Sequence, residues 1–298
     1  MNTPRLLAAL TASLTAASAA SAETVVVLED VGTTQQLFSF DSASPSDTNG
    51  RVAVTGLDDD GELLGIDYRP LTGELYGFTS NDNLFTIDPI SGVATKVGDG
   101  FTDSPAGTFY GFDFNPVIDK IRINSDVETN FVADPDSGDA NIADTTPLFY
   151  ESGDVNEGAN PNIIGAGYEN SVANADSTQL YVIDAALDVL ATQANNDGTL
   201  ATVGDLGVDL VDIGEFDISG ATGVAYIAGI VRGETDSTLF TVDLSSGSAT
   251  RVGTINSGTT IAGIAVAPGD AAVIPTPGAA AAGLALLGGV LARRKRAA

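Results

Sequence analysis

The 298-residue sequence contains no cysteine, no histidine and no tryptophan. Without thiols and imidazoles, the chain has no cysteine nucleophile, no histidine general base and none of the usual nitrogen and sulfur ligands of zinc, copper or haem iron. A Ser-His-Asp triad is excluded for the same reason. Disulfides cannot form, so the fold must depend on packing and on the closure of its sheets.

Basic residues are also scarce. The chain has 12 lysines and arginines against 40 aspartates and glutamates, and five of the basic residues lie close to its two ends. The central part therefore has seven basic residues against all 40 acidic ones. Such a surface repels nucleic acid and anionic membranes and attracts cations such as Ca²⁺. The charge favours an acidic coat that keeps an exported protein soluble over a dedicated cation-binding role.

Residues 1–22 have the layout of an export signal. Arg5 precedes a run of apolar and small residues from Leu6 to Ala17, and Ala20-Ser21-Ala22 is a small-x-small cleavage site. The run is short for a membrane-spanning helix and has no polar face. We therefore predict recognition by the export machinery and cleavage after Ala22.

Residues 271–298 also form a distinct segment. Pro275-Thr276-Pro277 is followed by an apolar run from Ala279 to Ala292 and by a basic cluster from Arg293 to Arg296. The run is near or below the length that spans a bilayer, and a basic cluster stays on the cytoplasmic side. The layout resembles the PEP-CTERM family of bacterial sorting signals, with Thr276 in place of that family's Glu. The resemblance implies processing by an exosortase-like enzyme; a plain C-terminal membrane anchor is the alternative.

The central part contains a repeated hairpin. The segments 84–98 and 239–253 match almost position for position, and further copies begin at residues 37, 130 and 190. Each copy alternates apolar and polar residues, breaks at a Ser-Gly or Asp-Gly turn, and alternates again, which is typical of a β-hairpin. An aspartate before such a turn bonds to the backbone N–H two residues on. We expect this turn-forming role for Asp41, Asp88, Asp134 and Asp243.

A second repeated element precedes most of the hairpins. It reads Gly-x-Asp-x-x-Pro at residues 65–70 and 111–116, with weaker copies around Asp217 and at 165–170. With the hairpins, each unit supplies four strands in about 50 residues, which is the size of a β-propeller blade.

The ends of the repeated region complement each other. Residues 263–268 look like the first strand of a unit with no followers, and residues 24–28 look like a second strand with no predecessor. Joining them completes a blade and hides two sheet edges. We therefore predict an all-β domain at residues 23–270, a β-propeller of five four-stranded blades whose last blade is closed by both ends of the domain. Six blades or a β-solenoid are the alternatives.

The pattern also resembles a known family. Residues 65–77, together with the Leu-Phe-Thr-Ile-Asp…Ser-Gly…Ala-Thr…Val-Gly hairpins, resemble bacterial proteins that carry the DUF4394 domain. The resemblance covers roughly residues 30–268. It supports the repeated fold and implies no established activity.

The Gly-x-Asp strand is the expected innermost strand of each blade. If its aspartates point toward the axis, Asp67, Asp113 and Asp217 form a group of carboxylates that binds Ca²⁺. Close carboxylates also raise one another's pKa, which suits a general acid. The alternative, which we favour, is that each aspartate bonds to backbone at its own strand end.

Two functional classes fit these features. The first, which the absence of histidine and cysteine favours, is a non-catalytic cell-surface or extracellular-matrix protein that binds a polysaccharide, another ligand or a surface protein. The second is an extracellular hydrolase or lactonase that uses the channel carboxylates, with Ca²⁺ as the candidate cofactor. Both place the protein in the bacterial cell envelope or outside the cell, with membrane contact only through residues 271–298. The stretch 144–174, with the weakest repeat match, is the expected insertion and a candidate ligand-binding region.

Overall fold

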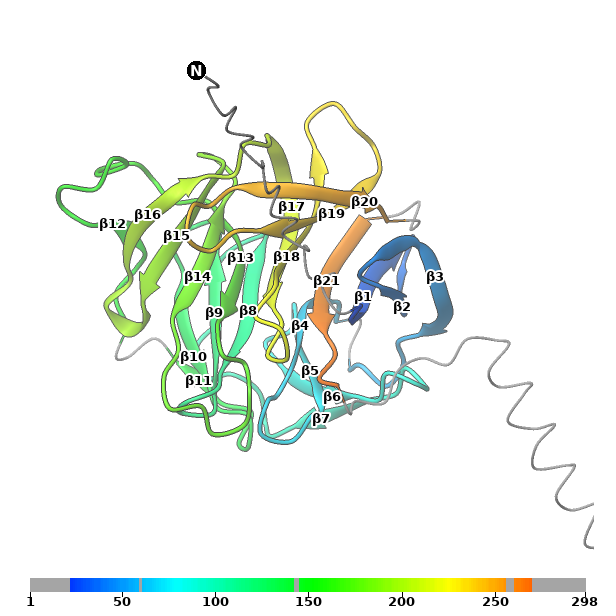
Figure 1. Ribbon diagram of the computed structural model, residues 1–298. Helices are drawn as coiled ribbons and strands as arrows, with labels where there is room; N and C mark the ends of the chain where they lie inside the picture. The colour runs from blue at the N-terminus through cyan, green and yellow to red at the C-terminus, as the bar shows by residue number, and fades with distance from the viewer. Residues whose placement is uncertain (1–21, 59–60, 142–144, 256–259, 270–298) are drawn as a thin grey trace, which may run out of the picture.

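The computed structural model describes residues 22–58, 61–141, 145–255 and 260–269. These residues form five small sheets arranged around a common axis (Figure 1). The described part of the chain contains no α-helix, and its one helical element is a single 3₁₀ turn, η1, at Asn195–Asp197. The fold is a five-bladed β-propeller, as the repeat predicts.

Each blade is described from the axis outward. Blade 1 contains β21 (Thr260–Val266), β1 (Thr24–Val31), β2 (Thr34–Asp41) and β3 (Ser44–Ala53). Blade 2 contains β4 (Leu63–Tyr68), β5 (Leu75–Thr79), β6 (Leu84–Ile87) and β7 (Ala94–Val97). Blade 3 contains β8 (Tyr110–Asn115), β9 (Lys120–Ser125), β10 (Asn130–Ala133) and β11 (Ala140–Asn141).

The other two blades follow the same order, with one addition. Blade 4 contains β13 (Ile163–Tyr168), β14 (Leu180–Asp184), β15 (Val189–Ala194), β16 (Thr199–Asp205) and β12 (Phe149–Tyr150). Blade 5 contains β17 (Leu210–Ile218), β18 (Ala225–Val231), β19 (Ser237–Val242) and β20 (Ala249–Thr254).

The core lies between the blades. The inner strands of a blade are buried on both faces, so β5 and β8 are buried at every residue, whereas the outer strands β7 and β20 are largely exposed. Four buried clusters of the described residues join neighbouring blades; one packs Val26 and Leu28 of blade 1 against Ile66 of blade 2. Burial on both faces explains why these strands are nearly continuous apolar runs.

Both ends of the domain meet in blade 1, which confirms the predicted seam. Val25 pairs with Val266, and Leu28 pairs with Gly263, so the first and last strands lie side by side (Figure 1). Glu23, just before β1, ties this blade to blade 5. Its carboxylate accepts hydrogen bonds from the hydroxyls of Ser219, of Thr222 at 3.0 Å and of Tyr226 at 2.8 Å.

The turn-forming aspartates are also confirmed. In each case one carboxylate oxygen accepts the backbone N–H two residues further on, at 2.8–2.9 Å. The four bonds close the turns that follow β2, β6, β10 and β19. Asp41, Asp88, Asp134 and Asp243 therefore have a local structural role.

The expected insertion divides into two parts. Its first part adds β12 to the outer edge of blade 4, parallel to β16. Asp154 fixes this part, because its carboxylate accepts the backbone N–H and the hydroxyl of Thr202, each at 2.7 Å. Its second part extends the connection between β13 and β14, where Ser171 and Val172 reach the end of the channel.

The predicted sorting motif Pro275-Thr276-Pro277 and the apolar run that follows it lie outside the described residues. Ala22, the predicted cleavage residue, is exposed and directly precedes Glu23. Within the described ranges, no helix has the length and apolar character needed to cross a membrane.

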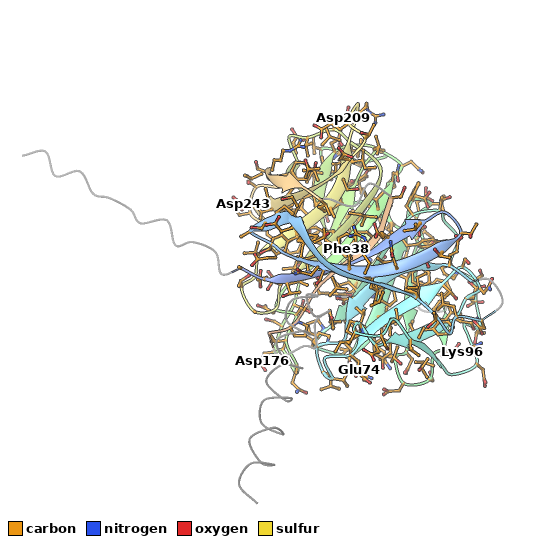
Figure 2. The ribbon with its side chains drawn as sticks, turned by 90° about the vertical axis from the view of Figure 1, so that its right-hand side faces the viewer. Phe38, Glu74, Lys96, Asp176, Asp209 and Asp243 are labelled. Atoms are coloured by element: carbon orange, nitrogen blue, oxygen red, sulfur yellow. The ribbon has the colours of Figure 1, made fainter. Side chains whose placement is uncertain are left out.

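Replacing Glu23 with alanine removes the acceptor of three hydroxyl groups at the junction of blades 5 and 1. We expect the Glu23→Ala variant to lose about 1–3 kcal/mol of unfolding free energy, the usual cost of hydrogen bonds to a charged group. Urea unfolding followed by circular dichroism measures this loss. Asp176→Ala, a change at an exposed acid (Figure 2), serves as the control and should leave the midpoint unchanged. Equal midpoints for the two variants would show that Glu23 does not hold the junction.

Candidate functional site: carboxylates in the propeller channel

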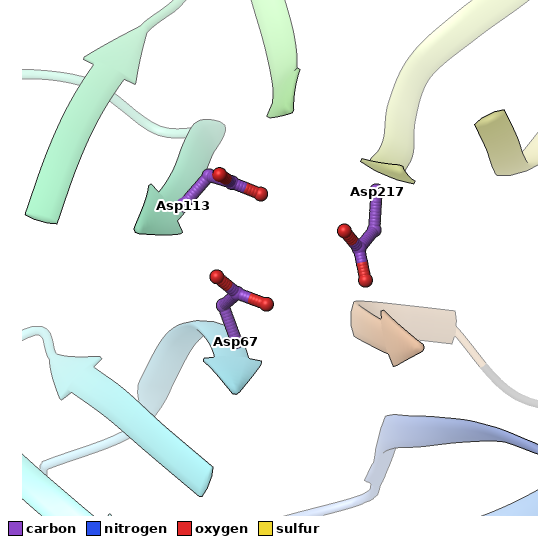
Figure 3. Close-up of side chains that lie close together, drawn as sticks. All are labelled: Asp67, Asp113 and Asp217. Carbon is purple, nitrogen blue, oxygen red and sulfur yellow. The ribbon is translucent and has the colours of Figure 1, made fainter. Parts of the chain in front are cut away.

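Three aspartates converge in the channel. Asp67 on β4, Asp113 on β8 and Asp217 on β17 each offer a carboxylate oxygen, and these oxygens lie within 4.8 Å of one another (Figure 3). The three side chains are 4 %, 1 % and 5 % exposed, respectively. The structure thus brings together the three residues that the repeat singles out. The corresponding positions on β13 and β21 are Gly167 and Ala265.

Each carboxylate binds the backbone of the following blade. Asp67 accepts the N–H of Phe114 on β8 at 2.9 Å, and Asp113 accepts the N–H of Tyr168 on β13 at 3.0 Å. Asp217 likewise accepts the N–H of Val266 on β21. The donor is always the residue just after the position equivalent to the aspartate, so each bond joins two neighbouring blades.

Blades 2 and 5 each follow a blade that has no aspartate at this position. The equivalent N–H groups of their inner strands therefore bond to an aspartate of the same strand. Asp67 also accepts the N–H of its own neighbour Tyr68, at 2.7 Å, and Asp217 accepts that of Ile218. Three carboxylates thereby satisfy the five equivalent N–H groups of the five inner strands. The favoured expectation is that each aspartate bonds to backbone at its own strand end. Two of these five bonds fit that expectation, and the other three cross between blades.

Burial makes the ionised forms of these carboxylates costly. It raises the pKa of Asp67 and of Asp113 well above the ordinary value, and the neighbouring carboxylates of the group raise both further. Burial also raises the pKa of Asp217, to about 6, although the N–H groups of Val266 and Ile218 oppose the shift. Three negative charges at this separation require a compensating charge, which protons or a cation supply.

A pocket of about 210 Å³ opens above the carboxylates at this end of the channel. Asp67 and Asp217 line it, whereas Asp113 lies outside its lining. Its other walls come from the ends of the inner strands and from the segments that follow them: Tyr68, Pro70, Ser171–Ala173, Ile218–Ala221 and Val266–Gly269. A polar ligand that enters the pocket would meet acidic groups among mostly apolar walls.

The repeat contains one further acid that the sequence analysis missed. Four inner strands have glycine two residues before the aspartate position, because the next inner strand lies very close there; a Cβ on Gly65 would lie 2.8 Å from the Cβ of Phe112. Blade 5 has Glu215 instead, which is half-buried and lines a second pocket at the opposite end of the inner strands, beside Asp30 and Glu62. Burial raises the pKa of Glu215 well above its usual range. An acid at a glycine position of the repeat was the signal that could have revealed it.

A profile of the family described as a domain of unknown function, DUF4394, matches residues 36–265. The chain belongs to the DUF4394 family. This match confirms the resemblance that the Gly-x-Asp strands and the hairpins indicate. The description of the DUF4394 family assigns no activity to it. Among curated proteins, none matches the chain.

Several solved structures are similar to this DUF4394 protein. One is a nidogen/laminin complex, at 14 % identity and a TM-score of 0.48, over 82 % of this chain and 98 % of the other. A second is a structural-genomics protein of unknown function from Bacteroides thetaiotaomicron (15 %, TM-score 0.45, 69 % of this chain and 53 % of the other). A third is hydrazine synthase from Kuenenia stuttgartiensis (14 %, TM-score 0.39, 67 % and 51 %). The DUF4394 chain spans about half of the latter two chains.

Neutralising one channel carboxylate should stabilise the metal-free protein at neutral pH. Asp113→Asn keeps an oxygen for the N–H of Tyr168 but removes a buried charge. Because the folded-state pKa of Asp113 is raised, its carboxyl destabilises the fold as the pH rises through that pKa. We expect a higher free energy of unfolding at pH 7, by about 1.4 kcal/mol for each unit by which the folded-state pKa exceeds the unfolded one, and no gain at pH 4.

Urea unfolding in a chelator at both pH values measures this gain. Asp67→Asn is the comparison, because it loses one of two N–H bonds and should be destabilised even at pH 4. A gain for Asp113→Asn that is larger at pH 4 than at pH 7 would contradict the assigned direction of the pKa shift.

Proposed function

We propose that this chain is an exported, non-catalytic binding protein of the bacterial cell envelope or cell surface, and that its channel carboxylates bind a cation beneath the ligand pocket. The observation that carries the proposal is the convergence of Asp67, Asp113 and Asp217 within 4.8 Å in a buried site. Ca²⁺ is the candidate cation, since it takes carboxylate oxygens and completes its shell with water.

The arrangement around the carboxylates supports a binding role. Their backbone bonds hold them in place before any ligand arrives, and a bound cation replaces the protons that otherwise neutralise them. Asp67 and Asp217 line the pocket. A cation held between them would keep a side open to the pocket, where an oxygen of a polysaccharide or of a partner protein can complete its coordination.

A hydrolase is the second candidate. Asp67 and Asp217 are two pocket carboxyls with raised pKa values, and a pair of carboxyls in different protonation states is the minimum that glycoside hydrolysis needs. All three channel aspartates, however, bind backbone N–H groups, which favours a fixed site over one that exchanges protons with a substrate. Activity in a broad glycosidase and lactonase panel that disappears in Asp217→Asn would decide for the hydrolase.

Cation binding is measured by calorimetric titration of Ca²⁺ at pH 7.5 and pH 5. We expect binding at pH 7.5, weaker binding at pH 5 because protons compete for the carboxylates, and at least tenfold weaker binding in Asp113→Asn. Asp47→Asn, a change at an exposed acid of β3, is the matched control and should bind like the unaltered protein. Equal heats for Asp113→Asn and the unaltered protein would overturn the cation site.

The proposed export and sorting concern the two end segments. Residues 1–22 would be removed by the export machinery, and residues 271–298, with Pro275-Thr276-Pro277, would be handled by an exosortase-like enzyme or remain as a membrane anchor. Glu23 directly follows the predicted cleavage site, and its carboxylate holds blade 5 against blade 1, so cleavage after Ala22 would keep this contact in the mature chain.

Intact mass spectrometry of the protein isolated from its natural host measures both ends. We expect Glu23 at the N-terminus and a C-terminus upstream of Ala298. An intact Ala298 would contradict C-terminal processing and leave the anchor, and a retained segment 1–22 would contradict export by this signal.

A further inference from the structure

A further cavity lies on blade 2. It shares Tyr68 with the channel pocket, but none of the three channel aspartates lines it. It is a groove of about 610 Å³, almost three times the volume of the channel pocket. Every residue that lines it belongs to β4–β7 and their turns: Tyr68, Gly73–Leu75, Thr86–Pro89, Ser91, Val93 and Thr95. Glu74, on its rim, lies at the edge of the propeller (Figure 2). The groove is large enough for a ligand of several hundred Å³.

Tyr68 contributes an unusual group to this groove. The residue is only 4 % exposed, and its hydroxyl has no hydrogen-bond partner among the described residues. A buried hydroxyl without a partner destabilises the free protein, and a ligand oxygen that accepts its hydrogen bond would remove this cost.

Blade 4 shows how the same position is satisfied elsewhere. Tyr168 occupies the equivalent place on β13, and its hydroxyl donates to Oδ1 of Asn195 at 2.6 Å. Tyr168 pairs with Leu180, which pairs with Gln193, and Asn195 follows two residues later. The same path in blade 2 leads from Tyr68 through Leu75 and Ile87 to Pro89. Proline has no side-chain acceptor, so the hydroxyl of Tyr68 is left for another partner.

The groove's surface combines hydroxyl, carboxylate and apolar groups. Thr86, Ser91 and Thr95 supply hydroxyls, and Glu74 is an exposed acid. Leu75, Ile87, Pro89 and Val93 supply apolar surface. This mixture matches a sugar, whose ring presents C–H faces and hydroxyl groups that both donate and accept. No lysine or arginine lines the groove, and the acids Glu74 and Asp88 would repel an anionic ligand.

We propose that this groove binds a neutral oligosaccharide, with the hydroxyl of Tyr68 donating to a ligand oxygen and Glu74 accepting from a ligand hydroxyl. The inference rests on the proposed binding role of the propeller and assigns it a ligand class. The groove and the channel pocket share only Tyr68 among their lining residues, so Glu74→Gln, which changes the groove alone, tests the groove separately.

The experiment is an array of neutral hexasaccharides, including maltohexaose and cellohexaose, with hexagalacturonate as the anionic probe, followed by calorimetry on the best neutral binder. Tyr68→Phe should weaken binding about tenfold, the equivalent of 1.4 kcal/mol, without lowering the melting temperature. Glu74→Gln should also weaken binding. The matched control is Tyr168→Phe, which loses its bond to Asn195 and should melt earlier but bind normally.

Three results would overturn the proposal: no neutral oligosaccharide binds, hexagalacturonate binds more tightly than the neutral sugars, or Tyr68→Phe binds as well as the unaltered protein. Asp113→Asn separates this site from the channel. It should bind Ca²⁺ at least tenfold more weakly but retain the oligosaccharide. If it loses the oligosaccharide while Tyr68→Phe retains it, the sugar binds in the channel and the groove assignment is wrong.

Discussion

The propeller depends on how the backbone N–H groups at the inner edge of each blade find hydrogen-bond acceptors. Each inner strand is the edge of its sheet, so the N–H groups that face the axis have no ladder partner. Buried N–H groups without acceptors destabilise a fold, and three carboxylates supply acceptors to all five equivalent groups. Glycine at the neighbouring position lets adjacent inner strands approach closely enough for these bonds. The axis is therefore held by polar contacts, while the spaces between blades are held by apolar packing.

The same arrangement links stability to charge. Acceptors for backbone N–H groups work best as carboxylates, yet three carboxylates in a buried channel repel one another. The fold tolerates this because protons or a cation can neutralise the group without breaking the backbone bonds. A site of this kind holds the inner strands together and can also take up protons or a cation. Mutations that test its function must therefore preserve an oxygen for each N–H group.

The features that the sequence predicts are those set within one blade or by the order of blades. The hairpins, the turn aspartates and the pairing of residues 24–28 with 263–268 follow from alternation, from turn residues and from the need to close a ring. The convergence of Asp67, Asp113 and Asp217 follows from their common repeat position. The bonds from each aspartate to the next blade and the place of Glu215 depend on how neighbouring blades are rotated and spaced, which local patterns do not specify. The unsatisfied hydroxyl of Tyr68 depends on the side chain that lies across blade 2 from it, Pro89, which the apolar alternation does not specify. The end segments remain predictions from sequence alone.

The completion of blade 1 by β21 has a consequence for the order of folding. Strands β1–β3 are synthesised first, but their innermost partner is the last strand of the domain. Until that strand arrives, β1 has an open edge and the ring has a gap where blade 5 should meet blade 1. Nearly the whole domain must therefore have been synthesised before the ring can close. A chain that begins to fold while it is still being made reaches its closed form only when β21 has left the ribosome.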